Sequence, residues 1–186
     1  MPNQAIQAQL QARGLEVLGP CERLSQHAEL LQVSPLLRDF SVDEADLLGE
    51  CMLVVRAQPG QLLIEESEIS DWMMMLLRGT VDVGKRKAGA EGGLQQAGDI
   101  TRLAVLRAGA VLGEMSMLDG EPRYASCWAL SEVDAAVLTR AAVSRLIGAH
   151  PSIGAKLLVK LTQLLAQRLR NTSNQLVKEL RKSAPG

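Results

Sequence analysis

The most informative part of this chain is the stretch Gly113-Glu114-Met115-Ser116-Met117, closely followed by Pro122-Arg123-Tyr124-Ala125-Ser126. It brings a glycine, a carboxylate, the expected start of a short helix and an arginine within eleven residues. A phosphodiester keeps one negative charge near pH 7, and burying that charge requires a fixed cation and several hydrogen-bond donors. The two stretches therefore predict a pocket for a small phosphodiester that is attached to a ribose.

The residues of the two stretches have distinct predicted roles. Arg123 supplies a planar, permanently charged fork for the phosphate. Backbone N–H groups at a helix start, here those of Met115, Ser116 and Met117, supply further donors. Gly113 lets the backbone approach the ligand without a side chain in the way. Glu114, a carboxylate beside an anion, either accepts a hydrogen bond from a ribose 2′-hydroxyl or forms an ion pair with Arg123 when no ligand is bound.

Length and composition narrow the class of protein. The 186 residues, 47% of them hydrophobic, suffice for one domain with appendages and a real core. No stretch of the sequence approaches 18 uninterrupted apolar residues, so we expect no membrane span. The N-terminus has no basic region followed by an apolar run, so we expect no secretory signal and a cytoplasmic protein. The three cysteines are widely separated and none of them is part of a CxxC pair, which argues against a metal site; they are Cys21, Cys51 and Cys127.

The charge is distributed unevenly along the chain. Residues 140–186 carry nine Lys and Arg but one Glu, whereas the net charge of the whole chain is −1. A basic segment can contact nucleic acid or an acidic partner. Aromatic residues make up only 2% of the chain, too few for base stacking, so we interpret the segment as a solvated helix face and do not expect it to bind DNA.

The chain divides into a helical beginning and a strand-rich middle. Residues 3–12 and 22–50 are predicted to be helical, with a capped helix start at Ser41 and Glu44. Short apolar stretches separated by turn signals then predict a small antiparallel barrel or sandwich. These stretches are 51–56, 62–65, 72–77, 80–87, 102–107, 126–130 and 134–139.

Two segments of this middle part are less regular. The run from Trp72 to Leu77 has no alternation and fits a strand buried on both faces or a short helix; the flanking turns favour a strand. Residues 88–100 hold four glycines and little core material, which indicates a mobile hairpin loop.

The C-terminal part is predicted to be a short helix over 140–149 and a long helix from Pro151 to about Lys182. The long helix carries an apolar stripe on one face: Leu158, Leu161, Leu165, Leu169, Thr172, Leu176 and Leu180. About thirty helical residues extend about 45 Å, more than a small barrel can cover. We therefore expect a homodimer through residues 151–182, with a parallel helix from a second copy; the alternative is packing on its own barrel alone.

From Leu31 to Leu180 the chain resembles cyclic-nucleotide-binding domains, especially the sensor half of the bacterial cyclic AMP receptor (CRP/FNR-like) regulators. The resemblance rests on Pro59-Gly60-Gln61-Leu62-Leu63, on Gly79 and on the phosphate-binding cassette from Gly113 to Ser126. It implies an α+β fold, with an antiparallel β-roll (jelly-roll) barrel, flanking N-terminal helices and a long C-terminal dimerisation helix. The implied parts are an N-terminal extension over 1–30, the β-roll over 31–150 and the helix over 151–182.

The resemblance also implies roles for particular residues. In the family, the glutamate at the position of Glu114 holds the ribose hydroxyl, and the arginine at the position of Arg123 holds the phosphate. The stretch from Arg168 to Ser173 resembles the dimer helix of the bacterial cAMP receptor, in which a Thr-Ser pair contacts adenine. This places Thr172 and Ser173 in the predicted site beside Tyr124 and Ala125 of the cassette.

The chain departs from the family pattern at three points. Tyr124 stands where relatives carry Ser, Thr or Ala, and its ring could stack on the purine, point outward or block the pocket. Ser67 replaces a glycine that is common in the second hairpin. Only Ser-Ala-Pro-Gly follows Lys182, whereas the transcriptional relatives continue into a DNA-reading helix-turn-helix.

We predict a stand-alone cyclic nucleotide receptor, not an enzyme, that binds cAMP and signals to a protein effector whose identity the sequence does not reveal. Thr172 and Ser173 favour cAMP, and cGMP is the alternative ligand. The nucleotide is bound as a ligand, and no cofactor is expected. The competing hypothesis is a structural or protein-interaction module that has kept the fold and lost the ligand, for which Tyr124 is the main argument.

Overall fold

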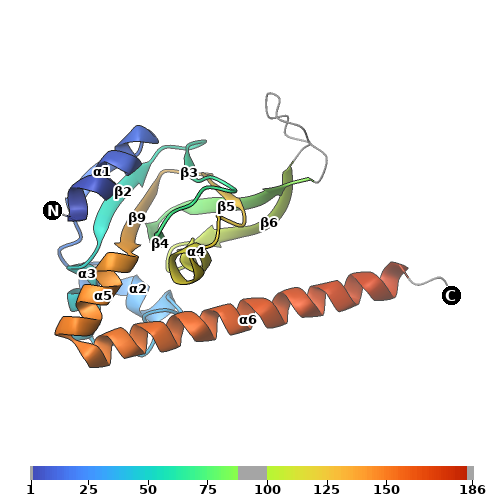
Figure 1. Ribbon diagram of the computed structural model, residues 1–186. Helices are drawn as coiled ribbons and strands as arrows, with labels where there is room; N and C mark the ends of the chain where they lie inside the picture. The colour runs from blue at the N-terminus through green and yellow to red at the C-terminus, as the bar shows by residue number, and fades with distance from the viewer. Residues whose placement is uncertain (1, 88–99, 184–186) are drawn as a thin grey trace.

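The computed structural model describes residues 2–87 and 100–183 and confirms an α+β fold with antiparallel sheets (Figure 1). One sheet has five strands, in the order β1 (Glu16–Pro20), β2 (Leu53–Ala57), β9 (Val133–Thr139), β4 (Trp72–Arg78) and β7 (Val111–Leu112). The other has four, in the order β3 (Leu62–Ile64), β8 (Ser126–Ala129), β5 (Thr80–Arg86) and β6 (Ile100–Arg107).

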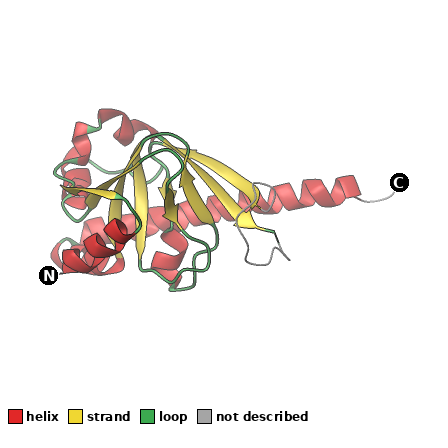
Figure 2. Cartoon of the chain, turned by 90° about the horizontal axis from the view of Figure 1, so that it is seen from above, coloured by secondary structure: helices red, strands yellow, loops and turns green. Residues whose placement is uncertain are grey.

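Most of the helices gather at one end of this pair of sheets, and the long C-terminal helix runs along them (Figure 2). They are α1 (Pro2–Ala12), the short 3-10 helix η1 (Leu24–Gln26), α2 (Ala28–Val33), α3 (Val42–Gly49), α4 (Glu114–Asp119), α5 (Arg140–Ala149) and α6 (Pro151–Ser183). None of the helices in the described part of the chain combines the length and the apolar character that crossing a membrane requires.

Strand β4 separates two hydrophobic cores. Trp72, Met74 and Leu76 face a core between the two sheets, which α1 also joins. Met73 and Met75 face a second core, where α2, α3, α5 and the beginning of α6 pack on the outer side of the five-stranded sheet. The uninterrupted apolar run is therefore a strand buried on both faces, as the sequence predicted, because alternate side chains serve different cores.

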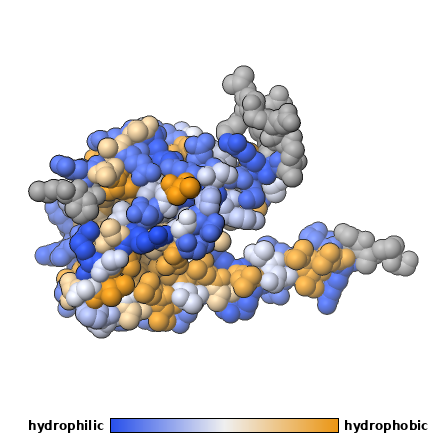
Figure 3. All heavy atoms as spheres, viewed as in Figure 1, coloured by the Kyte–Doolittle hydropathy of each residue, from blue (hydrophilic) through white to orange (hydrophobic). Residues whose placement is uncertain are grey.

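Helix α6 is only partly covered by its own domain. Leu157 and Leu161 are buried in the second core, but Leu169, Leu176 and Leu180 are 68%, 60% and 61% exposed. Figures 1 and 2 show that the C-terminal half of α6 extends past the sheets, and Figure 3 shows apolar side chains near its end. At 33 residues the helix is about 50 Å long, so the sheets cover only part of its apolar stripe.

The N-terminal third differs from the prediction. The prediction of helix over residues 22–50 holds only in part, because η1, α2 and α3 lie there but non-helical residues separate them. Residues 16–20, for which the sequence predicted no strand, form β1, which pairs antiparallel with β2. Pairing with an available sheet edge overrode the local signals of Gly19 and Pro20, because backbone hydrogen bonding depends on a distant strand.

Two local predictions have clear outcomes. The capping box of α3 is confirmed, because the Ser41 hydroxyl accepts from the Glu44 N–H at 3.2 Å and the Glu44 carboxylate accepts from the Ser41 N–H at 2.9 Å. The loop predicted over 88–100 lies outside the described residues, apart from Ile100 at the start of β6.

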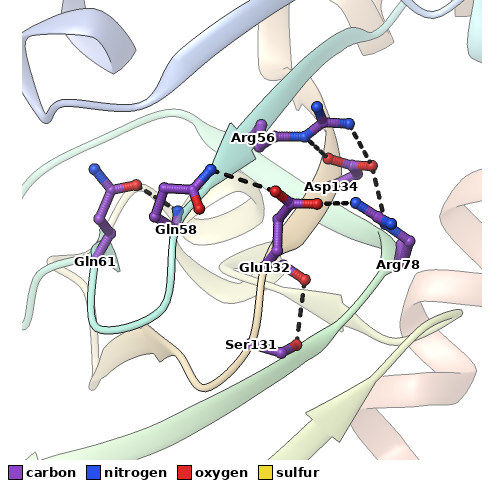
Figure 4. A network of polar contacts seen from close by, with 7 residues as sticks. All are labelled: Arg56, Gln58, Gln61, Arg78, Ser131, Glu132 and Asp134. Carbon is purple, nitrogen blue, oxygen red and sulfur yellow. Dashed lines mark hydrogen bonds and ion pairs between the residues drawn. The ribbon is translucent and has the colours of Figure 1, made fainter.

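A polar network ties one end of the sheets together (Figure 4). Arg56 of β2 donates two hydrogen bonds to Asp134 of β9, at 2.7 and 3.1 Å, and Arg78 approaches the same carboxylate at 3.3 Å. Gln61 donates to the carbonyl oxygen of Gly14 at 3.0 Å and so connects this end to the turn after α1. Gln58 donates from its N–H to Gln61 Oε1 at 2.6 Å and from Nε2 to Glu132 at 3.4 Å, so the network also holds the turn that precedes β3.

Candidate functional site

A cavity of about 410 Å³ lies between the four-stranded sheet, α4 and the middle of α6. It collects almost all of the residues singled out from the sequence: Gly113, Glu114, Met115, Ser116, Arg123, Tyr124, Ala125 and Thr172. Ser173 is the exception, because it is exposed on α6 and does not line the cavity of its own chain. The predicted carboxylate and guanidinium thus share one cavity.

Gly113 shapes the entrance to α4. Its φ of 75° lies in the left-handed region, and it is the residue from which α4 begins. A Cβ atom there would lie 2.9 Å from the Cδ1 atom of Ile64 and 3.1 Å from the Cζ atom of Arg123. Both the backbone conformation and the close approach of the guanidinium therefore require glycine.

Arg123 is part of the cavity wall and is only 3% exposed. Its Nη1 atom donates to the Gly113 carbonyl and its Nη2 atom to the Trp72 carbonyl, both at 2.5 Å, and the guanidinium lies 4.4 Å from the centroid of the Trp72 ring. Burial lowers the pKa of Arg123 to about 10, although the nearby carboxylate of Glu68 opposes this shift. Arg123 is therefore still charged near pH 7, and main-chain carbonyls fix its orientation.

Glu114 is 1% exposed and bonded to Arg168 of α6. Arg168 also donates from Nη2 to the carbonyl oxygen of Val111, at 2.5 Å. The alternative in which Glu114 pairs with Arg123 is therefore wrong for this structure. Glu114 is paired with Arg168, whereas Arg123 binds main-chain carbonyls, because α6 brings a second arginine into the cavity.

The sequence reasoning missed Arg168 and Asn171, which also line the cavity. Residues three and four apart share a helix face, so Arg168 lies on the same face of α6 as Thr172, one turn earlier. The signal was present in the sequence, but only the packing of α6 shows that this face turns toward Glu114.

Tyr124 lies at the rim of the cavity and is 58% exposed. The Nζ atom of Lys85 lies 3.8 Å from the centroid of the tyrosine ring and donates to the Tyr124 carbonyl oxygen at 2.8 Å. Lys85 also lies 3.5 Å from a carboxylate oxygen of Glu66. Among the three alternatives for this tyrosine, the structure supports the outward orientation.

The remaining walls are mostly apolar. Val83, Leu103, Leu106 and Leu112 line the side formed by the sheet strands, a surface suited to an aromatic base. Cys127 is part of this wall, and burial raises the pKa of its thiol to about 12, so it remains protonated near pH 7. A second cavity of about 520 Å³ shares Leu106, Arg168 and Asn171 with the first but contains no residue of the predicted site.

Sequence comparisons identify the family. The profile of the cyclic nucleotide-binding domain matches residues 54–150, just over half of the chain. The CRP-like cAMP-activated global transcriptional regulator of Mycobacterium tuberculosis is 29% identical over 127 residues, which are 68% of this chain and 51% of the regulator. The cGMP-dependent protein kinase egl-4 of Caenorhabditis briggsae is 31% identical over 112 residues, 60% of this chain and 13% of the kinase. The chain thus spans about half the length of the curated regulator.

Solved structures lead to the same family. A cyclic nucleotide-binding domain from Methylobacillus flagellatus is 32% identical and superposes with a TM-score of 0.76, covering 92% of this chain and 91% of that one. The catabolite activator protein of Thermus thermophilus is 26% identical, with a TM-score of 0.66, 77% of this chain and 62% of that one. On the profile match and these superpositions, the chain belongs to the cyclic nucleotide-binding domain family.

Proposed function

We propose that this protein is a cyclic nucleotide receptor that prefers cAMP and passes the bound state to another protein. The observation that carries the proposal is the convergence of Arg123 and Glu114 on one cavity, with the apolar strand wall beside them. A buried cation, a buried acceptor and an apolar surface match the phosphate, the ribose hydroxyl and the base of one ligand.

The proposed contacts of the ligand follow from the N–H donors of the site that are not already bonded within the protein. A guanidinium has five N–H donors, and Arg123 uses two of them on main-chain carbonyls. The other donors of Arg123, together with the amides of Met115 and Ser116, bind the phosphate in this proposal. Glu114 accepts the ribose 2′-hydroxyl, which selects against deoxy ligands.

Signalling in this proposal uses the contact between Glu114 and Arg168. This ion pair ties α6 to the cassette, and a ribose hydroxyl at Glu114 would share or displace Arg168. A ligand shifts the position of α6 only to the extent that it binds one arrangement better, and each tenfold preference corresponds to about 1.4 kcal/mol. Helix α6 is therefore the element that reports binding to the partner protein.

A second copy of the chain fits the exposed stripe of α6. Leu169, Leu176 and Leu180 are more than half exposed and repeat at helical spacing, as a parallel helix pair through residues 151–182 requires. Thr172 lines the cavity and supports the preference for adenine. Ser173 is exposed and does not line the cavity of its own chain, so an adenine contact from it requires the dimer.

Isothermal titration with cAMP, cGMP and 2′-deoxy-cAMP tests the proposal. We expect cAMP to bind most tightly and the deoxy ligand to lose at least tenfold. Arg123→Ala should weaken cAMP binding at least about tenfold, because a hydrogen bond to a charged group contributes roughly 1.5–3 kcal/mol. The matched control is Arg102→Ala, which breaks an exposed ion pair with Asp82 outside the cavity.

Two outcomes would overturn the proposal. If no cyclic nucleotide gives binding heat, the protein-interaction module that has kept the fold but lost the ligand becomes the better hypothesis. If Arg123→Ala binds cAMP as tightly as Arg102→Ala, the phosphate is not held where we place it.

A further inference from the structure

Helix α1 packs against the back of the candidate site. Ile6 and Leu10 are buried in the core between the sheets, the core that also contains Trp72 and Ile64. The ring of Trp72 lies beneath the guanidinium of Arg123, and Ile64 lines the cavity. The N-terminal helix therefore contributes to the core behind Arg123, the residue predicted to bind the phosphate.

A polar connection runs parallel to these apolar contacts. Arg13, in the turn that follows α1, forms an ion pair with Glu68, and Gln9 of α1 donates to the same carboxylate oxygen at 3.3 Å. Their ion-paired side chains are 15% and 21% exposed, so water screens this pair only partly. The carboxylate of Glu68 is thus held from the side of α1.

The main chain of Glu68 holds Arg123 directly. The Arg123 N–H donates to the Glu68 carbonyl oxygen, and the Ser67 N–H donates to the Arg123 carbonyl oxygen, each at 2.8 Å. Ser67 has a φ of 68° and is the sole non-glycine residue with positive φ in the described part of the chain. Such a conformation is unfavourable for a residue other than glycine and persists where its surroundings enforce it, so these hydrogen bonds fix the path of the main chain into Glu68.

One carboxylate thereby lies within the electrostatic reach of two guanidiniums. Arg13 Nε, Glu68 Oε2 and Arg123 Nε are all buried, and none of them has a hydrogen-bond partner among the described residues. Burial lowers the pKa of Arg123, Glu68 opposes that shift and Arg13 adds to it. If Arg13 released Glu68, the carboxylate would be attracted to the buried guanidinium of Arg123.

We propose that Arg13 is a positioning residue for Arg123. By holding Glu68 on the side of α1, Arg13 leaves the charge of Arg123 available to an incoming phosphate. Displacement of α1 lets Glu68 pair with Arg123 and compete with that phosphate, so the N-terminal helix sets the affinity of the site. The effect on nucleotide affinity rests on the proposed function, whereas the link from Arg13 to Arg123 does not.

The test combines NMR and calorimetry on the full chain. The chain has two tryptophans, so a nitrogen-15 spectrum shows two indole N–H signals, which Trp128→Phe assigns. Arg13→Met should move the signal of Trp72, beneath Arg123, and should weaken cAMP binding by about fivefold, within the range measured for coupled neighbours. Arg13→Met combined with Glu68→Gln should restore both, because the competing charge is gone. Arg56→Met, which breaks an ion pair in the network of Figure 4, should change neither.

The readouts separate the possible failures. An unmoved Trp72 signal in Arg13→Met, or a loss of affinity that Glu68→Gln does not rescue, would refute the positioning role; a lower melting temperature alone marks an ordinary structural contact. If the wild type binds no cyclic nucleotide, the receptor proposal fails, but the Trp72 signal still decides whether Arg13 controls Arg123.

Discussion

Replacing Gly113 by alanine is the sharpest test of how the cassette is built. The substitution introduces one methyl group at a φ of 75°, next to the side chains of Ile64 and Arg123. Gly120, at the other end of α4, has a similar φ of 81°, but a Cβ there would lie at an ordinary 3.5 Å from Arg140. The two glycines thus differ in their contacts and share their backbone conformation.

The structure gives the expected magnitudes. A non-glycine residue in the left-handed region costs about 1 kcal/mol, which both variants should lose. In Gly113→Ala the methyl group must also displace the guanidinium of Arg123, which breaks at least one charged hydrogen bond of about 1.5–3 kcal/mol. We therefore expect the free energy of unfolding to fall by about 3 kcal/mol in Gly113→Ala and by about 1 kcal/mol in Gly120→Ala.

Urea denaturation measures the free energy of unfolding of each variant, and isothermal titration calorimetry measures its affinity for cAMP. For a domain of this size, 1 kcal/mol shifts the melting temperature by about 2–4 °C, so Gly113→Ala should melt about 6–12 °C below the wild type. Because domains have a stability of about 5–15 kcal/mol, both variants should fold at 25 °C and can be titrated with cAMP. Equal stabilities, or equal affinities for cAMP, in the two variants would refute the packing of Arg123 against Gly113.

Two further predictions concern regions outside the cavity. The hydrogen bonds from Arg56 lower the pKa of Asp134 in the folded state, so the associated stability is present above the ordinary aspartate pKa of about 3.9 and is lost as the pH falls through the folded value. Asp134→Asn should therefore flatten the fall in unfolding free energy below about pH 4, measured by urea denaturation; an unchanged slope contradicts this assignment. Leu176→Glu places a charge in the exposed stripe of α6 and should shift sedimentation from dimer to monomer, whereas a wild type that sediments as a monomer would exclude the proposed pair.

Much of the fold could be predicted because its signals are local. Turn residues and apolar stretches located seven of the strands, and the capping box placed the start of α3. Strands β1 and β7 were not predicted, because β1 forms by pairing with β2, and β7 consists of only two residues paired with β4. Edge pairing depends on a partner far away in the chain, which no local pattern contains.

The cassette residues could be predicted for a similar reason. A glycine, a carboxylate and an arginine within eleven residues fall on a helix start and on the short segment that follows the same helix, so sequence spacing already brings them near a common point. The sequence alone thus indicated the cassette's share of the cavity, but not Arg168 and Asn171, which α6 adds to it.

Only the tertiary structure decided how these groups are paired. It placed Arg168 of α6 on Glu114, and Arg13 on Glu68 behind Arg123. These partners are more than fifty residues apart in the chain, and a buried charge selects the opposite charge that packing brings within reach, whatever their separation in sequence.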